Sequence, residues 1–235
     1  MPSKVFQVEG IGPVTLTKRR GARNIRLSVS ARGEVKVSLP TYVPYAVGVR
    51  FALGKKDWLQ KHLKDKPAAT LSDGARVGKS YRLRLVDGPT NGASKVVIKG
   101  QEILVYANKL DEPELKAAVE RACERALRAD AKKLLAYRLN ELAQKNDYSY
   151  KSLTIKKLSA RWGSCSSDKR IALSLYLVQL PWHLIDYVIL HELNHTLHMN
   201  HQKPFWDQLT AVMPRAKDYR RELKTFRPAI LPDAS

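Results

Sequence analysis

Cysteine is scarce in this chain of 235 residues, which contains only Cys123 and Cys165. Two cysteines are too few for the disulfide framework of a small secreted domain, so nothing predicts an oxidising compartment. No stretch approaches the ~20 consecutive apolar residues of a membrane-spanning helix. Residues 1–9 lack the apolar core of a signal peptide. We therefore expect a cytoplasmic protein with no membrane segment.

Acidic residues are also few, because 22 Asp and Glu stand against 42 Lys and Arg, a formal net charge of +20. Such a charge attracts anionic partners, among them nucleic acid, nucleotides or other polyanions, and acidic peptides. It is equally compatible with a surface that is merely solvated. No stretch interleaves aromatic and basic residues in the way typical of a nucleic-acid module. The prediction of nucleic-acid binding therefore depends on net positive charge alone.

Residues 1–107 have the pattern of a β-rich part. Apolar and polar residues alternate over residues 25–29 and 35–39, on either side of a turn at 31–33, which predicts a hairpin with one buried face. The spacing of apolar residues then predicts a helix over residues 44–64. Further short strands are expected at 81–85, 96–98 and 103–105, separated by turns at residues 87–89 and at Gly100.

Residues 108–235 form the second expected part. Asp111, Glu112 and Pro113 are typical of a helix start, and the composition that follows predicts a long helix to about Asn146. Strands at residues 153–158 and 171–175 are expected to pair as a β-hairpin around loop 161–167, before a helix that begins at Pro181. The sequence thus predicts an α+β fold whose two parts meet at residues 107 and 108.

The helix after Pro181 carries the most informative motif, His191-Glu192-Leu193-Asn194-His195. Residues four apart lie one turn apart on the same helix face, so His191 and His195 can hold one metal ion. Glu192 between them is placed to take a proton from water at that ion. The string also occurs by chance on solvated helices. Residues 182–190 are too apolar for an exposed helix, however, and burying two imidazoles and a carboxylate is costly unless they have a role.

Two further histidines are candidates for a third ligand. His198 would lie about 10 Å along the axis from His191 if the helix continued, too far for bonds of about 2 Å to one ion. His201 is reachable if the helix stops after Met199 and the chain turns back at Asn200 in a left-handed conformation. It also has the +10 spacing of the metzincin string H-E-x-x-H-x-x-G-x-x-H, with His198 in the place of the glycine. We therefore predict His201 as the ligand and His198 as a supporting or substrate-facing group.

Other third ligands stay open, because a carboxylate further along the chain would also suit the metal: Asp207, Asp218 or Glu222. Three neutral imidazoles favour zinc, although iron, nickel or cobalt can occupy the same ligands.

Loop 161–166 combines a large aromatic residue, a thiol and hydroxyls between two predicted strands. Arg161 can bind a carboxylate or phosphate bidentately, Trp162 offers an apolar wall, and Gly163 permits close approach of the backbone. We expect this loop to line the active-site cleft. An edge strand can also hold an extended peptide, and the strand after Lys169 or that before Ser159 is suited to this task.

These motifs together resemble the YgjP-like metallopeptidase family. The specific similarity lies in residues 161–166, 186–195, 199–201 and 205–206, and a weaker similarity extends over the basic, strand-forming N-terminal part. The resemblance implies a zincin-like catalytic part related to the SprT-like peptidases. It also implies His191, His195 and His201 as metal ligands and Glu192 as the catalytic acid/base.

The leading functional hypothesis is therefore a zinc-dependent metallopeptidase that acts on a peptide or protein substrate, with Arg161, Trp162 and His198 in substrate binding. A metal-dependent phosphohydrolase of the nucleotide pyrophosphatase type is the alternative within enzymes, motivated by the positive charge. A nucleic-acid-associated protein with a structural metal site is a third reading, against which Glu192 argues, because a structural site needs no such carboxylate. Cys165 as a nucleophile is a fourth, and it lacks a paired base in the sequence.

Overall fold

The computed structural model describes residues 3–29, 35–59, 72–88, 93–110 and 112–230. The chain has an α+β fold, as predicted, with β-sheets followed by a helical stretch of 33 residues and a C-terminal helical part. It divides into two compact units, Met1–Ala68 and Ala69–Ser235. This division differs from the expected boundary at residues 107 and 108, because the second sheet shares one hydrophobic core with the long helix and the C-terminal part.

The described part of unit 1 contains a four-stranded sheet and the helix α1. Its strands pair in the order β1-β2-β4-β3, with β2 and β4 parallel and the outer pairs antiparallel. Helix α1 contacts this sheet through Gly48, where a Cβ atom would lie only 2.6 Å from the Leu16 side chain. The elements of unit 1 are β1 (Ser3–Val8), β2 (Gly12–Arg19), β3 (Arg26–Val29), β4 (Val35–Pro40) and α1 (Tyr45–Leu53).

The hairpin expected over residues 25–39 is confirmed, since β3 and β4 pair antiparallel with Val29 opposite Val35. Its turn at residues 31–33 lies outside the described residues. The helix expected over residues 44–64 ends at Leu53, and a second helical stretch occupies residues 56–59. Residues 60–64 again lie outside the described part of the chain.

Unit 2 begins with a sheet that repeats the strand order and directions of the first, in the order β5-β6-β8-β7 with β6 and β8 parallel. The apolar faces of these strands share a core with the helix that follows. This repeated topology was not predicted, because the two sheets share the order and directions of their strands but differ in their side chains. The strands are β5 (Arg76–Val77), β6 (Tyr81–Val86), β7 (Lys95–Lys99) and β8 (Glu102–Tyr106).

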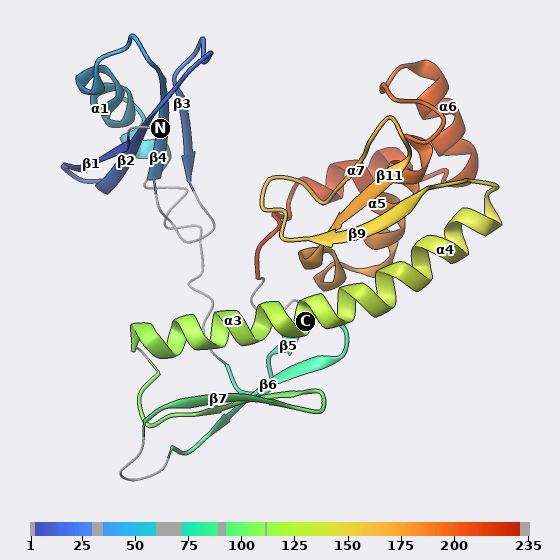
Figure 1. Cartoon of the computed structure of the whole chain (residues 1–235), viewed down its shortest axis with the longest axis horizontal. Coiled ribbons are helices and arrows are strands. Elements are labelled where there is room, and N and C mark those ends of the chain that lie inside the picture. The colour runs from blue at the N-terminus through green and yellow to red at the C-terminus, as the bar shows by residue number, and fades with distance from the viewer. Residues whose placement is uncertain (1–2, 30–34, 60–71, 89–92, 111, 231–235) are drawn as a thin grey trace. The chain divides into compact units, whose positions relative to one another are not determined.

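The long helix predicted from residue 113 onward is confirmed, and it comprises α3 (Pro113–Asp130), a π-helical turn (Ala131–Leu135) and α4 (Ala136–Lys145). Figure 1 shows the sheet and the C-terminal part on opposite sides of this helix. At the expected start of this helix, Glu112 is the N-cap residue and makes no side-chain cap hydrogen bond. Asp111 lies outside the described residues.

Asp130 ties the long helix to the sheet. Its buried carboxylate accepts hydrogen bonds from the backbone N–H groups of Lys79 (2.7 Å) and Ser80 (2.9 Å). Gly78, at φ +72°, has no room for a side chain there, since a Cβ would lie 2.6 Å from Asp130 Oδ2. The helix thus fixes the turn that precedes β6.

The third sheet departs from the expected hairpin. Strand β9 (Ser152–Lys156) pairs parallel with β11 (Arg170–Ser174), and the expected loop contains a strand of its own, β10 (Gly163–Cys165), antiparallel to β11. The hairpin is therefore β10–β11. Because the order is β10-β11-β9, strand β11 is central, and β9 and β10 form the edges.

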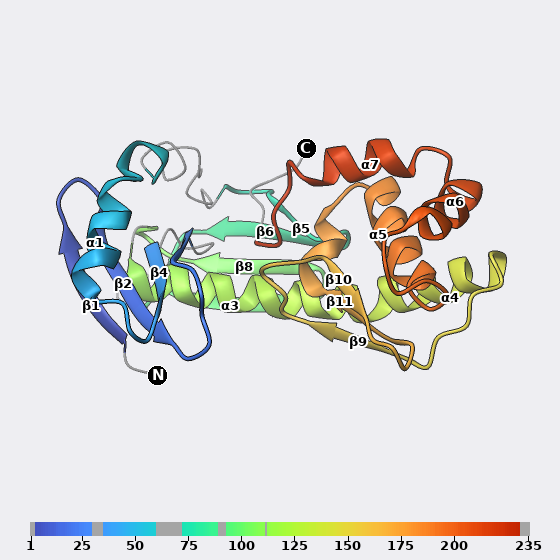
Figure 2. The same cartoon turned by 90° about the horizontal axis from the view of Figure 1, so that it is seen from above.

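Four helical elements complete unit 2. They are a 3-10 helix (Leu175–Gln179), α5 (Trp182–Asn194), α6 (Lys203–Val212) and α7 (Ala216–Leu223). Helix α4 holds α5 in place through the Arg138 guanidinium. Its Nε donates to Asp186 Oδ1 and its Nη2 donates to Asp186 Oδ2, both at 2.6 Å. Figure 2 shows β10 and β11 beside α5, and contacts of α5 with both strands agree with this view.

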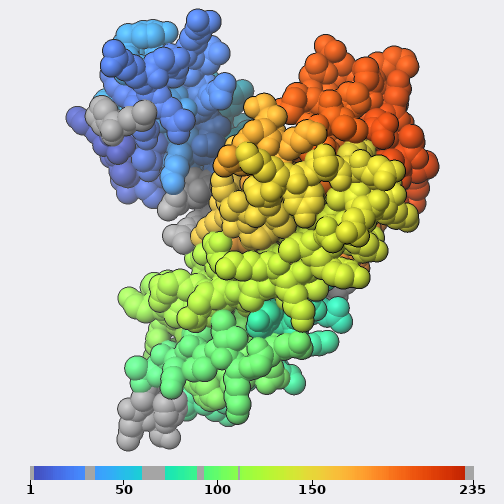
Figure 3. Space-filling model, turned by 45° about the vertical axis from the view of Figure 1, so that its right-hand side comes forward, coloured from blue at the N-terminus to red at the C-terminus, as the bar shows by residue number. Residues whose placement is uncertain are grey.

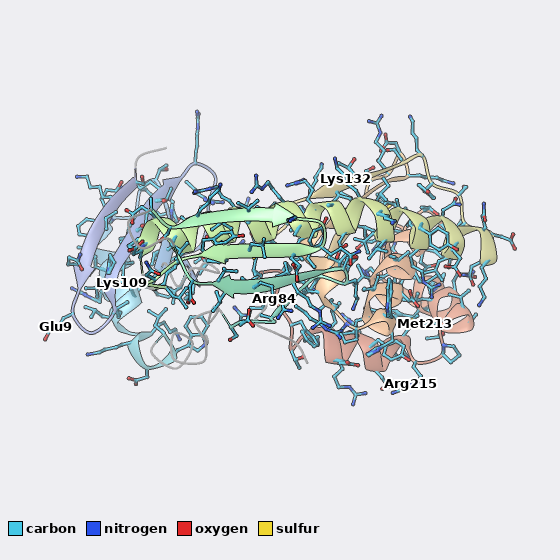
Figure 4. The ribbon with its side chains drawn as sticks, turned by 90° about the horizontal axis from the view of Figure 1, so that it is seen from below. Glu9, Arg84, Lys109, Lys132, Met213 and Arg215 are labelled. Atoms are coloured by element: carbon cyan, nitrogen blue, oxygen red, sulfur yellow. The ribbon has the colours of Figure 1, made fainter. Side chains whose placement is uncertain are left out.

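Charged side chains cover the exterior of the molecule (Figure 4). Arg84 projects from β6 and Lys132 from the long helix, while Arg215 lies at the exposed turn between α6 and α7. In the described part of the chain, no helix has both the length and the apolar character needed to cross a membrane.

Candidate active site

Helix α5 forms because an apolar run follows Pro181, its N-cap residue, and the run is buried as predicted, including Leu184, Ile189 and Leu193. The helix ends at Asn194, with His195 as its C-cap residue. This is earlier than the expected end at Met199. The predicted left-handed turn at Asn200 is wrong, because the non-glycine residues with positive φ in the described chain are Asp147 and Lys169.

The early end of α5 allows the chain to return, and it brings three histidines together. One possible ligand atom from each of His191, His195 and His201 lies within 4.8 Å of the others. His191 Nε2 and His201 Nε2 are 3.0 Å apart. Two nitrogens bonded at 2.0–2.1 Å to one tetrahedral ion lie about 3.3 Å apart, so the donor set fits a zinc-sized cation.

The site favours neutral imidazoles, the form that binds metal. Burial, together with the charges of His195, His201 and Arg220, lowers the pKa of His191 to about 3. Burial also lowers the pKa of His201, with His195 and Arg220 contributing. Both rings therefore keep a lone pair available near neutral pH.

Neighbouring groups orient two of the three rings. His195 Nδ1 lies 2.9 Å from the backbone oxygen of His198, so its proton is satisfied there and Nε2 is left for a metal. Trp206 Nε1 donates to the backbone oxygen of His201 at 3.1 Å. His191 Nδ1 is buried and finds no hydrogen-bond partner among the described residues. That ring is held by contact with Tyr187 and Phe205 instead.

Phe205 and Asn194 hold the cluster together, and the sequence analysis did not assign them this role. The Phe205 ring lies 4.7–5.0 Å from the centroids of all three histidine rings. Buried Asn194 donates to the backbone oxygen of Phe205 at 2.8 Å and accepts from Tyr148 Oη at 3.2 Å. The sequence did contain one signal for Asn194: a side-chain amide within an apolar helix is expected to be buried and therefore to need hydrogen-bond partners.

Glu192 is buried with 6% of its surface exposed. Burial raises the pKa of its carboxyl to about 8, and the positive charge of Arg161 acts in the opposite direction. Gly163 lies against it: a Cβ on Gly163 would be 2.6 Å from Glu192 Oε1. Loop 161–166 therefore lies against Glu192 through Gly163, while its predicted place in an active-site cleft and its role in substrate binding stay predictions.

The predicted substrate residues occupy different environments. Arg161 is exposed and Trp162 is buried, and both line a pocket of about 480 Å³. Trp162 also accepts a hydrogen bond from the Ser174 N–H through its backbone oxygen, at 2.8 Å. His198 is outside the three-histidine cluster and contributes its backbone oxygen to His195.

The carboxylates considered as third ligands make ion pairs away from the cluster. Asp207 pairs with Lys203, Asp218 with Arg221, and Glu222 lies 2.9 Å from His183 Nε2. Cys165 is a poor nucleophile, because burial and, to a smaller extent, the charge of Glu192 raise the pKa of its thiol to about 11.

A family of known proteins matches this chain over most of its length. The family described as "YgjP-like, metallopeptidase domain" matches residues 23–226. Among curated proteins, none matches the sequence. A solved structure, the metallopeptidase zymogen abylysin of Pyrococcus abyssi, is 22% identical over 40% of this chain and 95% of that one, with a TM-score of 0.36.

Proposed function

This chain belongs to the YgjP-like metallopeptidase family, and from that premise we propose that it is a zinc-dependent peptidase with Glu192 as general base. The carrying observation is the cluster of three histidines, together with the buried Glu192, which directly follows His191 in α5. His191, His195 and His201 would hold the ion. Zinc held by these three residues would supply Lewis acidity toward water and a carbonyl oxygen.

Glu192 performs the proton transfers in this proposal. Its carboxylate accepts a proton from the attacking water and returns it to the leaving amine, so that the base is regenerated after each turnover. A pKa of about 8 matches this task, because the group can both accept and release a proton near neutral pH. Arg161, whose charge favours the carboxylate form, would keep Glu192 ready to accept.

Strand β10 would position the substrate. It is an edge strand, since it pairs only with β11 among the described strands, and its first residue, Gly163, lies against Glu192. An extended peptide that pairs with β10 would therefore carry its carbonyl groups past the catalytic carboxylate. Two strands were expected to have this role. The strand after Lys169 is the central strand β11, with both edges occupied, whereas the strand before Ser159 is β9, the other edge strand among the described residues. Arg161 and the backbone amides of the loop are candidate donors to the developing oxyanion.

A parallel assay tests the proposal. The zinc-loaded protein is incubated with an unfolded protein, with peptides and with nucleoside triphosphates, and each reaction is repeated with Glu192→Gln. We expect cleavage of the unfolded protein and peptides by wild type and its loss in the variant. The net charge of +20 supports a second candidate, a metal-dependent phosphohydrolase. Triphosphate cleavage that depends on Glu192, without any peptide cleavage, would establish that alternative.

A further inference from the structure

Unit 2 has a strongly basic pocket that is lined in part by loop 161–166, the loop whose Gly163 lies against Glu192. Four cationic side chains line the pocket. Arg161 precedes β10, Arg220 lies in α7, and Lys224 and Arg227 follow that helix. Trp162 and Phe226 contribute apolar wall, and the volume is about 480 Å³. We call this the basic pocket. Figure 3 shows part of the surface formed by the segments that follow α4 and by the C-terminal helices.

No described carboxylate lines the basic pocket. Within the part of the chain that the structure describes, Arg161, Arg220 and Lys224 form no ion pair, whereas neighbouring Arg221 pairs with Asp218. Gathering like charges around a concave surface is unfavourable without an anion, and such a surface concentrates anionic ligands. The pocket is therefore suited to a negatively charged group.

Two of its cations connect the pocket to the reaction centre. Arg161 is electrostatically coupled to Glu192. Arg220 lies over the Trp206 ring at 5.0 Å, and that indole donates to the backbone oxygen of His201. Through Arg161 and Arg220 the basic pocket is thus linked to Glu192 and to the segment that carries His201.

We propose that the basic pocket binds an acidic side chain of the peptide, near the bond that is cleaved, and so selects acidic sequences as substrates. This inference rests on the proposed peptidase function. The apolar walls from Trp162 and Phe226 suit the methylene groups of a glutamate, and the guanidinium of Arg161 suits its planar carboxylate. A peptide paired with β10 places side chains next to Arg161, which stands two residues before Gly163.

Binding measurements on the zinc-loaded, full-length Glu192→Gln chain test the pocket independently of catalysis. Two fluorescein-labelled decapeptides differ only in having Glu or Gln at two adjacent positions, and affinity is measured by fluorescence anisotropy. We expect the Glu peptide to bind about tenfold more tightly at low salt. Lys224→Glu should reduce this preference to below about threefold, and Lys224→Gln should give an intermediate value. Melting temperatures confirm that each variant is folded.

Lys217→Glu is the matched control, because it changes the net charge by the same amount as Lys224→Glu. Lys217 is an exposed residue of α7, whose C-cap is Lys224, and it does not line the pocket. It should keep the preference. Equal affinity for the two peptides, or an equal loss in Lys217→Glu, overturns the proposal, since the second result indicates net charge alone. Tripolyphosphate displacing the peptide about a hundredfold better than citrate overturns the carboxylate assignment. Acidic preference in binding with no cleavage by wild type leaves the pocket standing and refutes the peptidase function.

Discussion

Gly163 lies directly against the carboxylate of Glu192. A Cβ atom added to Gly163 would stand 2.6 Å from Oε1, 2.7 Å from Cγ and 2.9 Å from Cδ of that side chain. Real Cβ atoms do not approach other atoms so closely, and the buried carboxylate has little room to move. The absence of a side chain at the start of β10 therefore sets the position of the proposed general base.

Gly163→Ala should displace Glu192 and lower kcat by more than about tenfold while the zinc content is unchanged, because a displacement near 1 Å disrupts proton transfer more than ligand binding. Kinetics and elemental analysis on the same preparation check this. Gly54→Ala is the control, since its Cβ would meet the nearest atom at 3.6 Å with ordinary helical φ. Unchanged kcat in Gly163→Ala contradicts the role assigned to this contact.

Glu192→Gln should fold and bind zinc like wild type but lose hydrolysis by at least about a hundredfold, because the amide cannot accept the proton. Circular dichroism, zinc content and peptide cleavage measure the three properties. Activity within about threefold of wild type would exclude Glu192 as the general base.

His201→Ala should lose stoichiometric zinc, because it removes one of three proposed ligands. His198→Ala should retain zinc with an affinity within about tenfold of wild type, since His195 is oriented by the backbone oxygen of residue 198 rather than by its side chain. Elemental analysis after dialysis compares the two. Loss of zinc in His198→Ala with retention in His201→Ala would reverse the assignment.

Cys165→Ser should keep peptide cleavage within about threefold of wild type, because the thiol has a pKa of about 11 and is not ionised at neutral pH. Iodoacetamide at pH 7.5 should likewise leave the activity unchanged. Rapid inactivation that substrate protects against would instead favour a nucleophilic Cys165.

Asp130→Ala should lower the free energy of unfolding by roughly 1–3 kcal/mol, because two backbone N–H groups lose their buried acceptor. Urea denaturation followed by circular dichroism measures the change. Lys132→Ala on the same helix, an exposed position, is the control and should change stability by less than about 0.5 kcal/mol. An equal effect of the two substitutions would show that the carboxylate does not hold the turn.

Local patterns predicted the parts of the fold that depend on local geometry. The long helix from Pro113 to Lys145 and the β3–β4 hairpin follow from helix-forming composition and strict alternation. Strand partners were harder to predict. The parallel pairing of β9 with β11 and the short strand inside loop 161–167 depend on contacts distant in sequence, and three residues are too few to show a period.

The unit boundary shows the same limit. Composition changes near residue 107, where strands give way to a helix, and this suggested a division there. The described units instead meet at residues 68 and 69. The sheet β5–β8 cannot bury its apolar face alone and shares its core with α3. The sequence of the sheet or of the helix, taken alone, does not predict which helix covers which sheet.

The sequence by itself determined that His191 and His195 lie on one face of a helix with Glu192 between them, because a helical turn fixes the spacing of residues four apart. It also indicated His201, through its distance along the chain. Only the tertiary structure decided that α5 ends at Asn194, that Phe205 packs against all three imidazoles, and that Gly163 lies against Glu192. These relationships join segments that are far apart in sequence, and they arise from burial of apolar surface and satisfaction of buried polar groups across the whole unit.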